Sequence, residues 1–381
     1  MVYFDNNSTT RPNIEVTDVV ANALRDNWAN PSSPHRLGTR VRLLIESARE
    51  EIAESLGVLP SHLFFTSGAT ESNNAVLSWA ERNATGHSSS VIISSIEHSS
   101  ILEPAQHYYP RGLNRIPVNE SGRVELSIVE QMIEETKPSL VSLMAAHNET
   151  GVLQPWEEVA QICKKRNIWF HCDATQWIGK LDPGQLNQCS SFSFSAHKFG
   201  GPKGVGALVS SLPVSMIKGG GQEMEARAGT ENFSGIEGMR TAWKLNCSSL
   251  STKDKEVSWK HHFEDTLLNR VPQSKIIGRG IPRLWNTTLV CLPEFDSLSW
   301  VSKLDKYGYS VSTGSACSTA RSQPSSLSGA IGLSESEGRR LVRISSYVEN
   351  KEQDWLGLSD AFGRAFDELK TDREAAGILS L

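Results

Sequence analysis

Short apolar segments alternate with helical segments through the first two thirds of this chain, and this alternation limits the folds it can adopt. Residues 37–56 place apolar side chains on one face of a helix, and Gly57 is a stop signal after it. Further helices are predicted at 70–79 and 156–165. Strand-like segments lie at 63–65, 91–94, 140–145, 168–171, 191–194 and 206–209. The pattern predicts an α/β domain with a largely parallel sheet.

The pattern changes after about residue 245. Residues 247–262 are polar and helical in pattern, and a final helix carries apolar residues at spacings of three and four from Trp355 to Leu369. Strand-like runs lie at 287–292, 309–312 and 341–344. We expect a large α/β domain over 14–245, and a smaller α+β domain formed by 1–13 with 246–381.

Composition narrows the class of protein. A chain of 381 residues with 38% hydrophobic and 21% charged residues is neither disordered nor a coiled coil, and it has the size of a two-domain enzyme. Its 38 basic and 43 acidic residues give a net charge of -5, so we expect no direct contact with nucleic acid. There is no apolar run near the roughly 20 residues that span a bilayer, and residues 1–12 lack the layout of a signal peptide. We expect a soluble, cytoplasmic protein.

The cysteines do not form a disulfide framework or a standard zinc site. No two of the six are spaced as a CxxC pair. A zinc site built from His171, Cys172 and Asp173 is discounted, because adjacent residues of a strand point to opposite faces. No metal is therefore expected.

Polar residues follow the predicted strands at the point where each strand ends. They are Ser67 to Glu71, Glu97, His98, His147, Asn148, Asp173, Gln176, Ser195, His197 and Lys198. Ligands of open α/β sheets bind outside the carboxyl ends of the strands, so these side chains should meet in one crevice.

Three of these features have both a functional and a structural interpretation. The turn at 67–70 could hold a phosphate on backbone N–H groups, or it could be an ordinary strand-to-helix connection. Lys198 could be a desolvated nucleophile or a surface lysine, and Asp173 could face a cationic partner or cap a helix. Together they fit pyridoxal phosphate, which needs a lysine amine, an acid against the pyridine nitrogen and an anion cradle. His98 could then stack on the ring, or it could be an ordinary histidine of the core or surface.

The sequence resembles the cysteine desulfurases of the class V aminotransferase group over essentially its whole length. The matching blocks are 3–5 with 8–10, 30–33 with 35, 66–73, 97–98, 148–151, 171–176, 195–198, 227–230, 314–318 and 343–345. The block at 314–318 and the long segment after it resemble the first desulfurase type, which has a long catalytic loop. The resemblance implies a homodimeric, pyridoxal phosphate-dependent transferase of fold type I.

The resemblance also implies roles for individual residues. Lys198 would hold the cofactor and move the substrate Cα proton, Asp173 would pair with the pyridine nitrogen, and His98 would stack on the ring as an acid or base. Phosphate contacts are implied for Ala69, Thr70, Ser195, His197 and, from the partner subunit, Thr230. Gln176 and Asn148 would bind the phenolic oxygen or the substrate carboxylate, which Arg343 would grip with its guanidinium.

Cys317 is the residue that would accept sulfur. It lies among small and polar residues from Thr313 to Gly329, which favours an exposed loop, and a thiol attacks only as a thiolate. The implied reaction converts L-cysteine to alanine and leaves a persulfide on Cys317 for a protein sulfur acceptor.

Some residues depart from the commonest pattern of the family. Ser346-Tyr347 stands where a small apolar run with glycine is expected, Ala196 replaces a frequent glycine, and His147 replaces a frequent asparagine. The tail at 371–381 shows no obvious motif for docking an iron-sulfur scaffold. This weakens an assignment to iron-sulfur assembly and leaves room for a dedicated sulfur donor, of the kind that feeds tRNA thiolation or DNA phosphorothioation.

Two alternatives are a different enzyme on the same scaffold, such as a selenocysteine lyase or an aminotransferase, and a non-enzymatic sulfur-relay subunit. Cys317 discriminates against the first, because transamination needs no cysteine. The presence of Lys198, Asp173 and Arg343 argues against the second.

Overall fold

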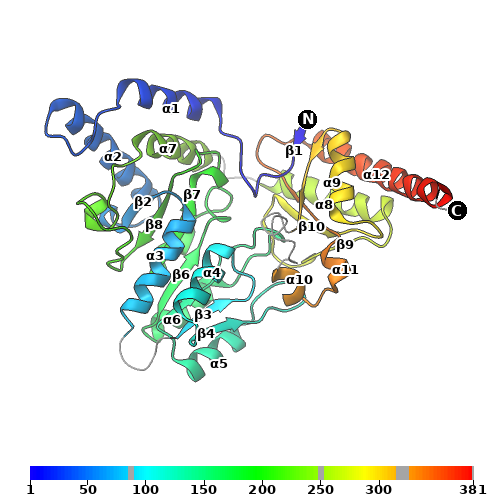
Figure 1. Ribbon diagram of the computed structural model, residues 1–381, viewed down its shortest axis with the longest axis horizontal. Helices are drawn as coiled ribbons and strands as arrows, with labels where there is room; N and C mark the ends of the chain where they lie inside the picture. Colours follow the sequence, from blue (N-terminus) through cyan, green and yellow to red (C-terminus); the bar gives the residue numbers. More distant parts are fainter. Residues whose placement is uncertain (85–89, 248–252, 315–325, 380–381) are drawn as a thin grey trace.

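The computed structural model describes residues 1–84, 90–247, 253–314 and 326–379. Within these ranges the chain forms a seven-stranded, a four-stranded and a two-stranded sheet (Figure 1). The strands of the large sheet are β2 (Leu63–Thr66), β3 (Val91–Ser94), β4 (Leu113–Ile116), β5 (Leu140–Ser142), β6 (Trp169–Asp173), β7 (Ser191–Ser195) and β8 (Gly206–Ser210).

The order of the large sheet is β2-β8-β7-β6-β5-β3-β4. Strands β3 to β7 pair in parallel, whereas β8 runs antiparallel to both β2 and β7. The predicted α/β fold with a mostly parallel sheet is confirmed. Because the parallel strands share a direction, their carboxyl ends lie along one edge of the sheet.

Helices cover both faces of this sheet. One face packs against α3 (Ala69–Arg82) and α4 (Ser99–Tyr108) through a core that includes Trp79 and Ile101. The helices of the other side are α1 (Ile14–Asp26), α2 (Arg36–Ser55), α5 (Leu126–Thr136), α6 (Trp156–Lys165) and α7 (Phe233–Cys247). Helix α6 has the predicted bounds, with acidic residues in its first turn and lysines in its last turn, as the helix dipole favours.

The smaller sheet is antiparallel, with the order β12-β13-β10-β9. Its strands are β9 (Lys275–Ile276), β10 (Thr287–Cys291), β12 (Ser312–Thr313) and β13 (Leu341–Ser345). The helices beside it are α8 (Asp254–Arg270), α9 (Ser297–Lys306), α10 (Ser326–Ala330), α11 (Glu335–Gly338) and α12 (Glu352–Leu379). A separate core around Trp300, Trp355 and Phe362 joins this sheet to α8, α9 and α12. The chain's first strand, β1 (Val2–Tyr3), pairs in parallel with β11 (Tyr309–Ser310). The domain bounds at 13/14 and 245/246 stay a prediction.

Three segments differ from the sequence expectation. The strand expected over 140–145 ends at Ser142, although Leu143 and Ala145 still donate backbone hydrogen bonds to β6. The helix expected over 247–262 is described from Asp254 and continues to Arg270, because Phe263 and Leu267 pack into the small core. The run at 309–312 divides into β11 and β12, because its two halves pair with different strands.

Four short 3-10 turns complete the described ranges: η1 (Pro60–His62), η2 (Gly184–Gln188), η3 (Ala196–Lys198) and η4 (Glu223–Glu225). None of the helices in those ranges has the length and hydropathy of a bilayer-spanning segment.

Candidate active site

The backbone N–H groups at the start of α3 lie beside the end of β7. The backbone N–H of Ala69 donates to Ser195 Oγ at 2.8 Å, and the N-cap residue Gly68 offers no side-chain cap. Gly68 has a φ of 150°, and a Cβ added there would lie 3.2 Å from Ser195 Oγ. Nδ1 of His197 is buried without a partner among the described residues, and burial lowers the pKa of this histidine to about 4. Thr70 is exposed at the mouth of the same turn. These groups suit a bound anion that replaces water.

Asp173, the last residue of β6, is a buried carboxylate held by two donors. Its Oδ1 accepts from the Thr175 N–H and its Oδ2 from the Asn73 amide, both at 3.0 Å. Asp173 forms no ion pair with any described residue. A buried carboxylate without a cation is costly, so the site suits a ligand that carries an N–H⁺ group.

Asn73 fixes the orientation of Asp173 through a buried hydrogen-bond network. Its Oδ1 faces the hydroxyl of Ser193 at 2.6 Å and Nε2 of His171 at 2.9 Å, so its Nδ2 group is turned toward Asp173. The other ring nitrogen of His171 contacts Ser191 Oγ at 2.9 Å. Burial lowers the pKa of His171 to about 4, so the ring is neutral near pH 7.

Replacing Asn73 with Ala removes a donor from a buried carboxylate. We expect a loss of about 1–3 kcal/mol in the free energy of unfolding and a weaker hold on the cofactor, since Asp173 is no longer fixed. Urea unfolding and cofactor titration followed by absorbance measure both effects. Asn74→Ala is the matched control on the adjacent, partly exposed position, and equal losses in both variants would contradict this role of Asn73.

Lys198 lies on η3, directly after β7, and its amine meets the N-terminal segment. Nζ donates to the backbone oxygens of Asn7 at 2.7 Å and Ser8 at 2.9 Å. The Asn7 oxygen also accepts from Gln176 Nε2 at 3.0 Å. Asn7 is buried and contacts the small sheet as well, through Thr287 Oγ1 at 2.9 Å. This one residue therefore joins the lysine to the second sheet.

Arg343 lies in the middle of β13 and points its guanidinium toward the same segment. Nη2 donates to Asp5 Oδ1 at 2.6 Å and to Ser8 Oγ at 2.5 Å, and Nη1 donates to the Asn148 backbone oxygen at 3.4 Å. Its Nε is buried without a hydrogen-bond partner among the described residues. A carboxylate ligand would satisfy this remaining donor.

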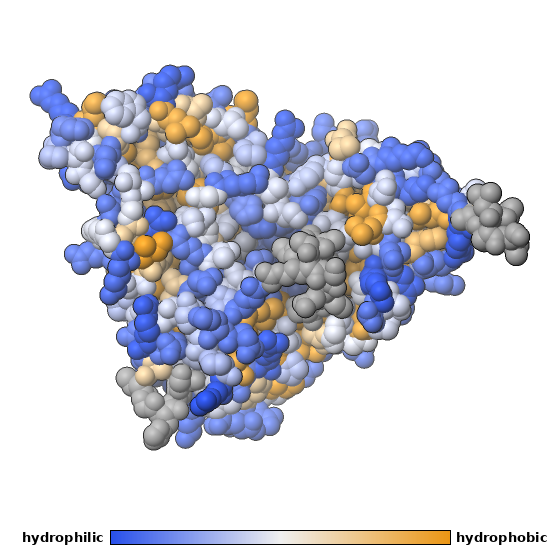
Figure 2. Space-filling view, in the orientation of Figure 1, coloured by the Kyte–Doolittle hydropathy of each residue, from blue (hydrophilic) through white to orange (hydrophobic). Residues whose placement is uncertain are grey.

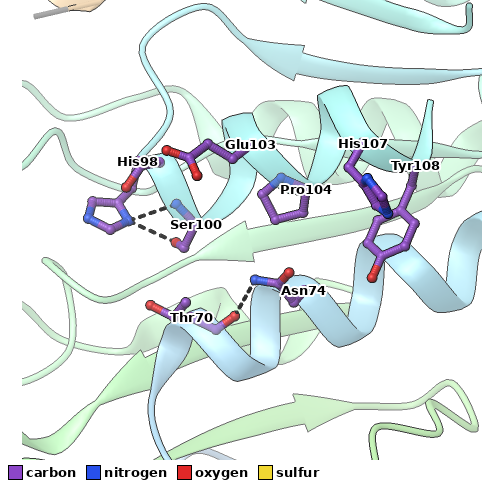
Figure 3. Close-up of a pocket in the computed structure, with 9 residues that line it drawn as sticks. Thr70, Asn74, His98, Ser100, Glu103, Pro104, His107 and Tyr108 are labelled. Atoms are coloured by element: carbon purple, nitrogen blue, oxygen red, sulfur yellow. Dashed lines mark hydrogen bonds between the residues drawn. The ribbon is translucent and has the colours of Figure 1, made fainter. Parts of the chain in front are cut away.

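His98 caps the N-terminus of α4, and its Nδ1 contacts the backbone N–H and the hydroxyl of Ser100 (Figure 3). Burial lowers the pKa of His98, while the charge of Asp173 acts in the opposite direction and that of Lys198 reinforces the shift. A pocket of about 430 Å³ opens beside this ring, between α3 and α4, and Thr70 lines it as well. Its size suits a small-molecule ligand.

Glu97 is a second buried acid beside Asp173. Its Oε1 accepts from the Met144 N–H at 2.8 Å, and its Oε2 has no partner among the described residues. Burial, with a contribution from the charge of Asp173, raises the pKa of Glu97 to about 8.

The structure brings most of the predicted residues together, with two qualifications. Thr230 is exposed, and within the described ranges it has no hydrogen bond to the cradle, although Arg227 of the same segment pairs with Glu71 of α3 at 2.9 Å. Cys317 lies outside the described residues. Gly314, the residue that precedes that segment, donates to the Leu341 oxygen of β13 at 2.8 Å.

Sequence reasoning gave no role to Asn7, Asn73 or Asp5. Asn73 lies three residues after Thr70 on a predicted helix, so helical periodicity alone could have placed it on the inner face. The contacts of Asn7 and Asp5 join segments more than 100 positions apart. No local pattern in the sequence carries that information.

Comparison with known proteins gives one family. A model of the aminotransferase class-V family, which depends on pyridoxal phosphate, matches residues 2–356. A cysteine desulfurase of Sinorhizobium fredii is 36% identical over 365 residues, which cover 93% of each chain. The cysteine desulfurase IscS of Dictyoglomus turgidum is 33% identical, with coverage of 97% of this chain and 95% of the relative.

Solved structures agree with the sequence relatives. A NifS-like protein superposes with a TM-score of 0.88 at 34% identity, covering 96% of this chain and 99% of that one. The chain belongs to the cysteine desulfurases of the class V aminotransferase family.

Proposed function

We propose that this protein binds pyridoxal phosphate between Lys198 and Asp173 and uses it to take sulfur from L-cysteine, leaving alanine and a persulfide on Cys317. The observation that carries the proposal is the convergence of three groups at one edge of the sheet. These are a lysine amine on η3, a buried carboxylate without an ion pair on β6, and the donor-rich turn at α3.

The chemistry of the donors fits this cofactor. Asp173 would balance the protonated pyridine nitrogen, and the turn at Gly68 and Ala69, with Ser195, His197 and Thr70, would hold the phosphate. His98 would lie against the ring, and Gln176 and Asn148 would be in reach of its phenolic oxygen or the substrate carboxylate. When bound, the cofactor supplies an electron sink for charge that develops at the substrate Cα.

The chain's own residues would carry the remaining steps. Arg343 binds the substrate carboxylate through its guanidinium, and Lys198 Nζ takes the proton from Cα. The thiolate of Cys317 attacks the substrate sulfur, so that an S–S bond forms while the Cβ–S bond breaks. Cβ keeps the electron pair and gains a proton, which gives alanine. In the net reaction, cysteine and one enzyme thiol are converted to alanine and one enzyme persulfide.

We also propose a homodimer, in which Thr230 of the partner subunit reaches the phosphate. Its support is the exposure of five large apolar side chains on α1, α2 and the segment between them: Ile14, Leu24, Trp28, Leu37 and Leu43. Figure 2 shows hydrophobic groups, interspersed with hydrophilic ones, over this end of the molecule. Large exposed apolar patches are typical of interaction sites.

The protein acceptor of the sulfur is left open between iron-sulfur assembly, tRNA thiolation and DNA phosphorothioation. A cytoplasmic location stays a prediction.

Replacing Cys317 with Ser tests the sulfur step. We expect the variant to keep the visible absorbance of the cofactor and to lose sulfide release from L-cysteine under reductant by at least about 100-fold, since a hydroxyl cannot form the S–S bond. Cys291→Ser, at a buried position in β10, is the control and should keep its activity.

Full sulfide release by Cys317→Ser would instead favour a class V lyase reaction that breaks the bond to Cβ without an enzyme thiol, such as that of a selenocysteine lyase. A wild-type protein that forms no alanine at all would contradict the desulfurase reaction itself.

A further inference from the structure

A fully buried lysine, Lys180, contacts Gln176 of the candidate site. It follows β6 in a turn, only 1% of its surface is exposed, and its backbone oxygen accepts from Trp285 Nε1 at 2.9 Å. Among the described residues, its amine has one hydrogen-bond partner, Oε1 of Gln176. No carboxylate of the described residues pairs with it.

Burying an amine with one hydrogen bond is costly, and the surroundings increase the cost. Burial and the positive charges of Lys198 and Arg343 push the pKa of Lys180 well below its usual range. Lys180 therefore contributes little to the stability of the fold. Its contact with Gln176 points instead to a role in the candidate site.

We propose that Lys180 is a positioning residue, whose amine fixes the side-chain amide of Gln176 with its NH₂ group toward Asn7 and Lys198. Lys180 Nζ donates to Oε1 of Gln176, and in its protonated form the amine has donors only, so it selects the amide oxygen. The NH₂ group is then left to donate to the Asn7 oxygen, at 3.0 Å. Lys198 Nζ donates to that same oxygen at 2.7 Å, so the two donors stand side by side.

This orientation of Gln176 affects the protonation of the link between Lys198 and the cofactor. A fixed NH₂ donor here favours the anionic form of the cofactor's phenolic oxygen, the contact proposed for Gln176. It thereby lowers the pH at which the link between Lys198 and the cofactor loses its proton. Without Lys180, the Asn7 oxygen is the only group among the described residues that still orients the amide, so its NH₂ group is held less firmly.

Other charged groups face the same space and are unchanged in the test. They are Asp173 on β6, Glu97 beside it, His98 at α4, His197 on η3, and Arg343 on β13 with Asp5.

The inference rests on the proposed function for its optical signal, and a double-mutant cycle tests it. The full-length, cofactor-loaded protein is titrated with pH, and the midpoint of the visible absorbance change is compared for the wild type, Lys180→Met, Gln176→Ala and the double variant. We expect Lys180→Met to raise the midpoint by about one pH unit, the effect of losing one hydrogen bond to a charged group. Gln176→Ala should do the same, and the double variant should show no further shift.

Lys260→Met is the matched control. Lys260 is also buried and donates to the Leu284 oxygen at 2.7 Å, but it lies on α8 beside the small sheet. Its replacement should leave the midpoint unchanged. Replacing a buried amine that has no ion pair with an apolar side chain is compatible with folding. If Lys180→Met does not fold, the midpoint is measured in Lys180→Leu instead.

Two results would overturn the inference: a wild-type midpoint in the Lys180 variant, or shifts that add fully in the double variant. Loss of the absorbance in Lys198→Ala, alongside either result, would show that the inference alone has failed. Retention of the absorbance in Lys198→Ala would instead count against the proposed function.

Discussion

Lys198→Ala is expected to lose the visible absorbance of the cofactor-loaded protein and to form alanine from L-cysteine about 1,000-fold more slowly. The amine is the group that holds the cofactor and the base that takes the Cα proton, and a positioned base contributes roughly 10²–10⁴-fold. Its position at the end of β7, against the Asn7 and Ser8 oxygens, leaves no other described lysine in the same contacts.

Lys203→Ala is the control for this loss, because Lys203 is exposed and five residues away on the same loop. It should keep the absorbance. A Lys198→Ala protein with a wild-type spectrum would show that the cofactor is held elsewhere.

Arg343→Lys is expected to raise the KM for L-cysteine by about 100-fold. The change keeps a positive charge but loses the planar fork that binds a carboxylate through two N–H groups. Truncating one partner of a desolvated charge pair costs about 2–5 kcal/mol, and about 2.8 kcal/mol corresponds to a hundredfold change in affinity. Steady-state kinetics with the cofactor-saturated protein measure the effect.

Asp5→Asn is the control that distinguishes a loss of substrate binding by Arg343 from a general disturbance of its surroundings. Asp5 pairs with Nη2 of Arg343, so the control loses the ion pair and keeps the guanidinium. We expect its KM to rise far less than that of Arg343→Lys. Equal changes in the two variants, or an unchanged KM in Arg343→Lys, would contradict the assignment of Arg343 to the substrate.

The sequence was enough to predict six of the seven strands of the large sheet and the edge at which its polar residues meet. Strand β4, at one end of the sheet, was missed, because only Ile116 of its four residues is buried and its apolar pattern is weak. Helix α6 has its predicted bounds, and strand β3 does as well, because apolar periodicity and flanking polar residues mark both. The antiparallel direction of β8 was not predictable, because its five residues are all buried and give no sign of strand direction.

The candidate site was predictable where its residues follow strands and not where they meet across the two sheets. Asp173 and Lys198 are signalled by their place after apolar runs. The contacts of Asn7 with Lys198 and Thr287 depend on how the N-terminal segment passes between the sheets. That path is set by tertiary packing, which the order of residues alone does not reveal.

Two of the departures from the family pattern, Tyr347 and His147, have local explanations. Tyr347 is buried, packs against Trp285 and hydrogen-bonds Asn246 of α7. Nδ1 of His147 accepts the N–H groups of Glu149 and Thr150, both at 3.2 Å, and so holds the turn that carries Asn148. Burial lowers the pKa of His147 to about 3, which keeps the ring neutral and able to accept. These residues support the walls of the site.

The attachment point of the cofactor can be measured directly. The loaded protein is reduced with borohydride, digested and mapped by mass spectrometry, which distinguishes Lys198 from its neighbours Lys180 and Lys203. The geometry predicts one pyridoxyl phosphate group per chain, on the peptide position of Lys198. A group on either neighbouring lysine, or no modified lysine in a protein that still converts L-cysteine to alanine, would contradict it.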